Sequence, residues 1–445
     1  MNYFAKNIIK SITTLTLISA VSGLAQAQVS NETLNQLVRS AIEYAPKIKE
    51  QQQNVNMADY RTKIQEAALK PTVQSEIGIT RLDPVSKPSL GGTTIQFQPY
   101  MNYNANIGAS YVIHDWGKQD LAIQKSKLES NVANTSIEGM KTMYAYQVAN
   151  LYYGIVYLQK AIEVQKEQLQ LVKDNETVIT NRLKQGDALD YDQVSIQVRY
   201  KNAEARLSDL QSQLDKQYIY LASLTGKDVR SLIANNASFD LPVADLSAAT
   251  ALEQAQTSNV DLKVLREKDL IAEKDVKISE LSMAPTLTAI GQVGFKNGYV
   301  PRINGEQPDF TDDFKLNTVL GIKLTIPVYS GGRGALGTSI AKVGRDQLKY
   351  SQEAVNQGLK RDLEAAQNDY YNAKNKLDLS EKNVFQAQYA LKLANARYKN
   401  GVITQVEIEA TQTALREAQL TQLQYQYQMT QAKLELNRLT GIKFW

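Results

Sequence analysis

Two acids stand at matching places in this sequence, each six residues after a glycine: Asp192 after Gly186, and Glu407 after Gly401. A tyrosine, Tyr398, precedes the second glycine by three residues. Both acids fall where a helix is expected to begin, and a carboxylate in the first turn of a helix interacts favourably with the helix dipole. From the residues alone, we therefore expect these acids to act through electrostatic interactions.

The sequence offers little material for catalysis or metal binding. The chain has 445 residues, no Cys and one His, which excludes disulfides, thiol nucleophiles and most zinc or copper sites. The histidine stands in His114-Asp115-Trp116, which lacks a third partner and is typical of a strand-to-helix corner with an interfacial aromatic residue. The net charge is +4 with both signs interleaved, so no basic patch indicates nucleic acid. We expect no catalytic residue, no cofactor and no metal ion.

Long helices must position the two acids. Between Leu151 and Leu183, apolar or small residues recur at alternating gaps of four and three, which is typical of coiled-coil packing. Gly186 can adopt the left-handed conformation that ends a helix. A second apolar stripe then runs from Ile196 to Leu224. The pattern predicts a long antiparallel helical hairpin.

The hairpin occurs twice. The turn Arg182 to Gly186 is repeated at Arg397 to Gly401, and Leu224-Thr225-Gly226 is repeated at Leu439-Thr440-Gly441. Both offsets are the same, 401 − 186 = 215 and 441 − 226 = 215. An internal period of this kind indicates duplication. We therefore expect a first repeat at residues 28–226, a linker at 227–250 lying against the outside of the helices, and a second repeat at 251–445.

Each repeat also contains two runs that resemble strands, expected at residues 72–82, 101–113, 286–296 and 314–326. In 101–113, apolar residues alternate with polar or small ones, and period two over about ten residues suits a transmembrane barrel strand. Exposed loops are expected between the strands of each pair, at 83–99 and 299–313. A helix is expected before each pair, at 34–69 and 248–282.

Residues 1–27 are predicted to be a signal peptide, with a basic start, a short apolar run and a small-x-small site at Ala25-Gln26-Ala27. An uncleaved membrane anchor is the alternative. Four strands are too few to close a barrel, so identical subunits must share one. The expected fold class is α+β, mostly α: coiled-coil hairpins forming an α-barrel, with four strands per chain entering a trimeric 12-stranded transmembrane β-barrel.

This ordered set of elements resembles the TolC family of outer-membrane efflux and secretion channels. The resemblance covers nearly the whole chain and includes Pro327-Val328-Tyr329-Ser330-Gly331-Gly332-Arg333 after the fourth strand. It implies a homotrimer in outer-membrane lipid with a helical tube extending into the periplasm. It also implies a periplasmic adaptor (membrane fusion) protein and an inner-membrane pump of the RND, ABC or MFS type. The chain would be the exit duct of a tripartite efflux or type I secretion system, exporting drugs or proteins.

The resemblance assigns roles to individual residues. Asp192, Tyr398 and Glu407 match positions of the periplasmic gate, with a polar link expected between Asp192 and Tyr398. The adaptor-facing tip would comprise Leu183, Gly186, Tyr398 and Gly401. The family arginine two residues after the second turn glycine is Ile403 here, so its link cannot form.

Two alternatives remain open at this point. Asp192 and Glu407 could serve only to stabilise the starts of their helices. The protein could also be a secreted trimeric coiled-coil structural or adhesive surface protein, in which the strands merely cap a stalk.

Overall fold

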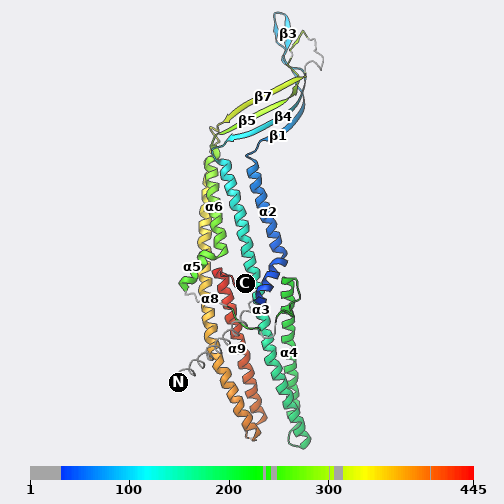
Figure 1. Cartoon of the computed structure of the whole chain (residues 1–445), viewed down its shortest axis with the longest axis vertical. Coiled ribbons are helices and arrows are strands. Elements are labelled where there is room, and N and C mark those ends of the chain that lie inside the picture. Colours follow the sequence, from blue (N-terminus) through cyan, green and yellow to red (C-terminus); the bar gives the residue numbers. More distant parts are fainter. Residues whose placement is uncertain (1–31, 234–236, 242–247, 300, 305–313, 401) are drawn as a thin grey trace, which may run out of the picture. The chain divides into compact units, whose positions relative to one another are not determined.

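The computed structural model describes residues 32–445 except 234–236, 242–247, 300, 305–313 and 401 (Figure 1). The expected signal peptide at 1–27 therefore lies outside the described residues. The chain forms two compact units, and each draws on both halves of the sequence. The sheet unit comprises residues 53–134 and 264–352, and the helical unit comprises the residues up to 52, 135–263 and 353–445.

The sheet unit contains a four-stranded antiparallel sheet in the order β1-β4-β5-β7. Its strands are β1 (Thr72–Arg81), β4 (Met101–His114), β5 (Thr286–Lys296) and β7 (Lys315–Thr325). All four predicted strands are confirmed to within one residue at each end. Strands β1 and β7 are the two edges of this sheet.

Alternation along the strands leaves an apolar face exposed. Ile107, Tyr111 and Ile113 of β4 are exposed, and so are Leu320 and Ile322 of β7. These are alternate residues, because successive side chains of a strand point to opposite faces. The predicted apolar face is therefore present, and it is uncovered in the single chain.

Gly294 of β5 is paired with Asn106 of β4 and leaves no room for a side chain. A Cβ atom on Gly294 would lie 2.2 Å from the carbonyl oxygen of Ala105 and 2.6 Å from the Cα of Asn106. Both atoms belong to the backbone and cannot rotate away. A side chain at position 294 is therefore incompatible with this pairing.

The first predicted loop, 83–99, contains structure that the sequence did not indicate. It forms β2 (Ser89–Leu90) and β3 (Thr93–Gln96), and β3 also pairs with β6 (Arg302–Ile303). The expectation of two plain loops was wrong for this part, because backbone hydrogen bonds join segments of both repeats. Much of the second loop, residues 305–313, lies outside the described residues.

Both helices that precede the strand pairs are interrupted. The first has a helix at 32–44, a break at Ala45, and then α2 (Pro46–Ala67), because proline fits the first turn of a helix but not its interior. The second is divided into α5 (Ala248–Ser258) and α6 (Val260–Glu280), followed by a short 3₁₀ turn. At the break, the Asn259 side-chain oxygen accepts hydrogen bonds from the amides of Asp261 and Leu262, at 3.0 and 3.3 Å. The prediction of two uninterrupted helices was wrong.

The long helices agree with the predicted hairpins. Helices α3 (Lys118–Gln185) and α8 (Arg333–Lys399) have 68 and 67 residues, and each is followed by a helix of 36 residues, α4 (Asp190–Thr225) or α9 (Gln405–Thr440). Both return helices end at a glycine in the left-handed conformation, Gly226 with φ 68° and Gly441 with φ 73°. None of the described helices is long and apolar enough to cross a membrane.

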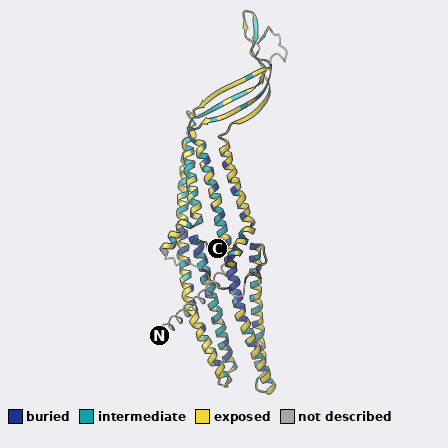
Figure 2. Ribbon diagram, viewed as in Figure 1, coloured by how far each residue is buried: buried dark blue, intermediate teal, exposed yellow. Residues whose placement is uncertain are grey.

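The core of the helical unit gathers around the middle of α3, where buried residues are concentrated (Figure 2). Tyr152 and Tyr153 are among the largest fully buried side chains. Residues of the linker, Val229 and Leu241, belong to the same cluster. The Tyr153 hydroxyl donates to the carbonyl oxygen of Asp240 at 3.0 Å. The described part of the linker therefore packs against the helices and contributes to their core.

Because these tyrosines are buried, we expect the protein to lose stability at high pH. Burial raises the pKa of Tyr152 to about 12 from an ordinary value of 10.0, and it also raises the pKa of Tyr153. Because the folded-state pKa exceeds the unfolded one, the stabilisation is complete below pH 10.0 and is lost as the pH rises through about 12. At 1.36 kcal/mol per pKa unit, Tyr152 alone accounts for about 3 kcal/mol.

Urea unfolding across this pH range measures the effect. The free energy of unfolding of the unsubstituted protein should fall steeply, and Tyr152→Phe should reduce the slope. Tyr220→Phe, at an exposed position of α4, is the matched control and should leave the slope unchanged. Equal slopes for all three proteins would contradict the prediction.

Candidate functional site

The predicted corner at the only histidine is present in the sheet unit. Strand β4 ends at His114 and α3 begins at Lys118. The Asp115 carboxylate accepts hydrogen bonds from the amides of Gly117 and Gln119, at 3.1 and 2.6 Å. Asp115 thus caps α3. Among the described residues, no group of three or more His, Cys, Asp or Glu could hold a metal ion.

In the helical unit, the turn between α3 and α4 is tight. Gly186 has φ 82°, and the amide of Asp187 donates to the carbonyl oxygen of Arg182 at 2.8 Å. Leu183 is half-buried at this end, whereas Leu189 is exposed. At the corresponding turn after α8, Gly401 lies outside the described residues.

Both predicted gate acids cap their helices. The Asp192 carboxylate accepts a hydrogen bond from the Leu189 amide at 3.1 Å. The Glu407 carboxylate accepts from the Thr404 amide at 2.7 Å and from its hydroxyl at 2.8 Å. These hydrogen bonds, first from the Thr404 amide and second from the Thr404 hydroxyl, lower the pKa of Glu407 from its ordinary value. The structure thus shows Glu407 in a capping box with Thr404, whereas Asp192 only accepts from the amide of the N-cap residue Leu189, whose side chain has no acceptor. Both acids fill the local role that the sequence left open.

Tyr398 contacts the other hairpin through its ring. The guanidinium of Arg182 lies 5.3 Å from the ring centroid, within the range of a cation–π interaction. The Tyr398 hydroxyl is buried and has no hydrogen-bond partner among the described residues. The expected hydrogen bond between Asp192 and Tyr398 is therefore not made in this structure.

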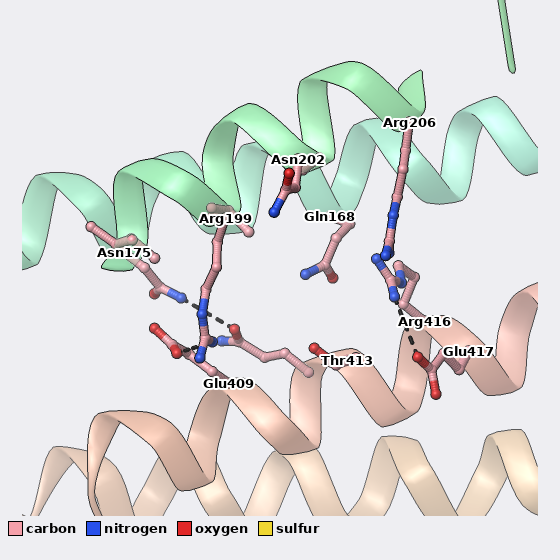
Figure 3. A pocket seen from close by; sticks show the side chains of 13 residues that line it. Gln168, Asn175, Arg199, Asn202, Arg206, Glu409, Thr413, Arg416 and Glu417 are labelled. Carbon is pink, nitrogen blue, oxygen red and sulfur yellow. Dashed lines mark hydrogen bonds and ion pairs between the residues drawn. The ribbon is translucent and has the colours of Figure 1, made fainter. Parts of the chain in front are cut away.

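A polar cluster joins the two hairpins further along the helices (Figure 3). Arg199 of α4 forms an ion pair with Glu409 of α9. Asn175 of α3 donates to the side-chain oxygen of Gln412 at 3.1 Å. Glu409 and Gln412 are buried, with 7% and 4% of their surfaces exposed. We call these four residues the interhairpin clasp, because they form polar links between the α3–α4 hairpin and α9.

The clasp is tightly constrained on the α9 side. Gln405 donates to the second carboxylate oxygen of Glu409 at 2.8 Å, so both oxygens of that acid are engaged. Only 9% of the Glu409 side chain is exposed, against 41% for Arg199. A buried carboxylate that loses its cation is strongly destabilising. The clasp therefore depends on Arg199 remaining in place.

The clasp was not predicted from the sequence, and the internal repeat does not mark it. With the offset of 215, Glu409 corresponds to Val194 (409 − 215 = 194), and Arg199 corresponds to Ala414 (199 + 215 = 414). A charged residue at each of these places has an uncharged counterpart in the other repeat. The same holds for other charged residues of these helices, such as Arg206, whose counterpart is Thr421, so comparing the repeats does not single out the clasp.

Comparison with known proteins gives a consistent result. The model of the outer membrane efflux protein family matches residues 37–227 and 251–442. The pyoverdine export outer membrane protein OpmQ of Pseudomonas putida is 22% identical over 415 residues, covering 92% of this chain and 85% of the relative. The outer membrane protein TolC of Vibrio cholerae is 21% identical over 428 residues, covering 95% and 94%.

Solved structures show the same fold. The outer membrane protein VceC from Vibrio cholerae superposes with a TM-score of 0.73 at 17% identity, covering 93% of this chain and 97% of that one. The Campylobacter jejuni CmeC outer membrane channel has a TM-score of 0.72 at 16% identity, covering 92% and 86%. The mostly helical α+β fold is thus shared with outer-membrane channels.

Proposed function

The chain belongs to the outer membrane efflux protein family, and from that premise we propose that it is the exit duct of a tripartite efflux or type I secretion system. It is an export channel of the outer membrane and not an enzyme. The observation that carries the proposal is the open four-stranded sheet with its exposed apolar face. An apolar face of this kind fits contact with lipid, whereas a secreted adhesive stalk does not require one.

The free edges of the sheet support a homotrimer. Strands β1 and β7 each present one unpaired side, and unpaired backbone groups in lipid cost several kcal/mol each. Three chains would supply twelve strands and close a barrel, with the paired long helices forming a tube into the periplasm. Each copy would pair its β1 with the β7 of its neighbour.

The partners follow from the same proposal. A periplasmic adaptor would contact the tip formed by Leu183, Gly186, Tyr398 and Gly401, and an inner-membrane pump of the RND, ABC or MFS type would supply the cargo. The relatives include proteins named for the export of pyoverdine and of toxins and drugs. We propose cargo of these kinds, small molecules or proteins, for this duct.

The gate is proposed to combine the predicted residues with the clasp. Asp192, Tyr398 and Glu407 lie at or beside the helical turns, and the clasp holds α9 against α4. Since Ile403 replaces the family arginine, the Arg199–Glu409 ion pair is a substitute link between the hairpins. Opening would require this pair to separate.

Purified full-length protein in planar lipid bilayers tests the proposal. We expect discrete conductance steps, and a heat-resistant trimer on denaturing gels that dissociates only on boiling. A species that stays a single chain and conducts no ions would refute the duct. Co-purification with an adaptor and a pump from the native host tests the tripartite assembly.

The Asp192→Ala variant separates the two roles of this acid. Loss of the hydrogen bond from the Leu189 amide to the Asp192 carboxylate should destabilise the start of α4 by about 1 kcal/mol and loosen the tip, which should raise the single-channel conductance. The matched control is Asp190→Ala, in the same first turn of α4. An unchanged conductance with faster amide exchange at the start of α4 would leave Asp192 as a cap and remove it from the gate.

A further inference from the structure

A cavity of about 240 Å³ lies between α3, α4 and α9 of the helical unit, and the clasp residues form part of its wall (Figure 3). Arg206 of α4 and Arg416 of α9 line it from opposite sides. Gln168 and Asn202 also line the cavity, and Figure 3 shows their side chains directed into the space between the helices. The four clasp residues and Glu417 also line it, so the lining holds three guanidinium groups, two carboxylates and four side-chain amides. Positive charges therefore outnumber negative ones by one.

Arg416 is poorly compensated for a buried cation. Only 11% of its side chain is exposed, and its Nε is buried with no hydrogen-bond partner among the described residues. Its one ion pair, with Glu417, is long at 3.5 Å, and that acid is 67% exposed. A buried N–H group without an acceptor carries a desolvation cost.

Arg206 adds a second positive charge without adding an acceptor. Within the described parts of the chain no acid pairs with it. The pKa of Arg416 is lowered mainly by burial and next by the positive charge of Arg206. The two guanidiniums are therefore close enough to repel each other. The Glu409 carboxylate does not offset these two charges, because it is already paired with Arg199.

We propose that Arg206 and Arg416 bind a small oxyanion in this cavity, of the phosphate or carboxylate class. Each guanidinium presents a fork of N–H donors that matches two oxygens of such an anion, and the free Nε of Arg416 gains an acceptor. Gln168 and Asn202 supply neutral amide donors around it. The bound anion joins α4 to α9, next to the ion pair that already does so.

Calorimetric titration of the purified full-length protein with inorganic phosphate, in a phosphate-free buffer, tests the proposal. We expect saturable binding of one phosphate per chain, with acetate competing as the carboxylate probe. Arg206→Gln and Arg416→Gln should each weaken binding at least about tenfold, the effect of losing a charge-assisted hydrogen bond. Arg361→Gln, at an exposed arginine of α8, is the control and should bind as the unsubstituted protein does.

Because Arg206 is exposed, its variant is expected to keep the fold even if Arg416→Gln does not, and circular dichroism checks the helix content. Absence of saturable binding at millimolar phosphate overturns the proposal. So does an equal loss of affinity in Arg361→Gln, or full competition by chloride at the same concentration, since either indicates general screening of charge.

Discussion

The Arg199→Ala variant is expected to conduct more current per channel than the unsubstituted protein. The substitution leaves the Glu409 carboxylate buried with the Gln405 amide as its remaining side-chain donor. Arg199 is partly exposed, so we discount the loss of a buried pair to about 1 kcal/mol, which changes a two-state population about fivefold. If the clasp holds the closed form, the open form should gain by that factor.

Planar-bilayer recordings of a double-mutant cycle measure this directly. Arg199→Ala and Glu409→Ala should each raise the open fraction, and the double variant should raise it by less than the product of the two effects. The matched control is Glu204→Ala, which removes the exposed ion pair between Lys201 and Glu204. That pair lies within α4 and does not join the hairpins. Its conductance should be unchanged.

The contrary result is equally clear. If both clasp variants conduct like the unsubstituted protein while keeping their helix content, the ion pair has no part in closure. The turn residues Asp192, Tyr398 and Glu407 would then have to hold the gate by themselves.

The Gly294→Ala variant is expected to fail at assembly. The added Cβ would lie 2.2 Å from the Ala105 carbonyl oxygen, so β4 and β5 must move apart or lose their register. Overpacking of this kind costs about 3 kcal/mol, and here the opposing atoms are backbone. Because β4 and β5 are the two central strands, the whole four-stranded sheet should be affected.

The heat resistance of the oligomer and its recovery in the outer-membrane fraction measure the effect. Gly294→Ala should lose both, whereas Gly108→Ala should retain both. At Gly108, on the same pair of strands, the nearest atom to an added Cβ is the Gly291 carbonyl oxygen at 3.8 Å, an ordinary contact. Normal assembly of Gly294→Ala would show that β4 and β5 can separate without loss of the sheet.

The strands and long helices could be predicted because their signals are local. Period-two alternation located β4 to within a residue, and the repeated Gly186 and Gly226 signals marked the ends of α3 and α4. The breaks at Ala45 and Asn259 were missed because the apolar pattern continues across them. Whether Pro46 or Asn259 interrupts a helix depends on how the chain packs around it.

Non-local features were the ones that the sequence did not indicate. The pairing of β3 with β6 joins segments of two or four residues from different repeats, too short to show a period. The clasp joins positions 199 and 409, and no local pattern in the sequence marks a contact between residues so far apart. The predicted acids Asp192 and Glu407 were found in local capping bonds, and their part in a gate stays a prediction.

The duplication has a mechanical consequence for a ring of three such chains. Within one chain, the contact between α4 and α9 is ionic, through Arg199 and Glu409. By the repeat, the equivalent contact between neighbouring chains would place Val194 and Ala414 where those charges stand. Six similar hairpins would then meet at six contacts of two alternating kinds, three ionic and therefore sensitive to salt, and three apolar. Raised ionic strength would weaken the three ionic contacts first, so such a ring would widen with threefold symmetry instead of sixfold.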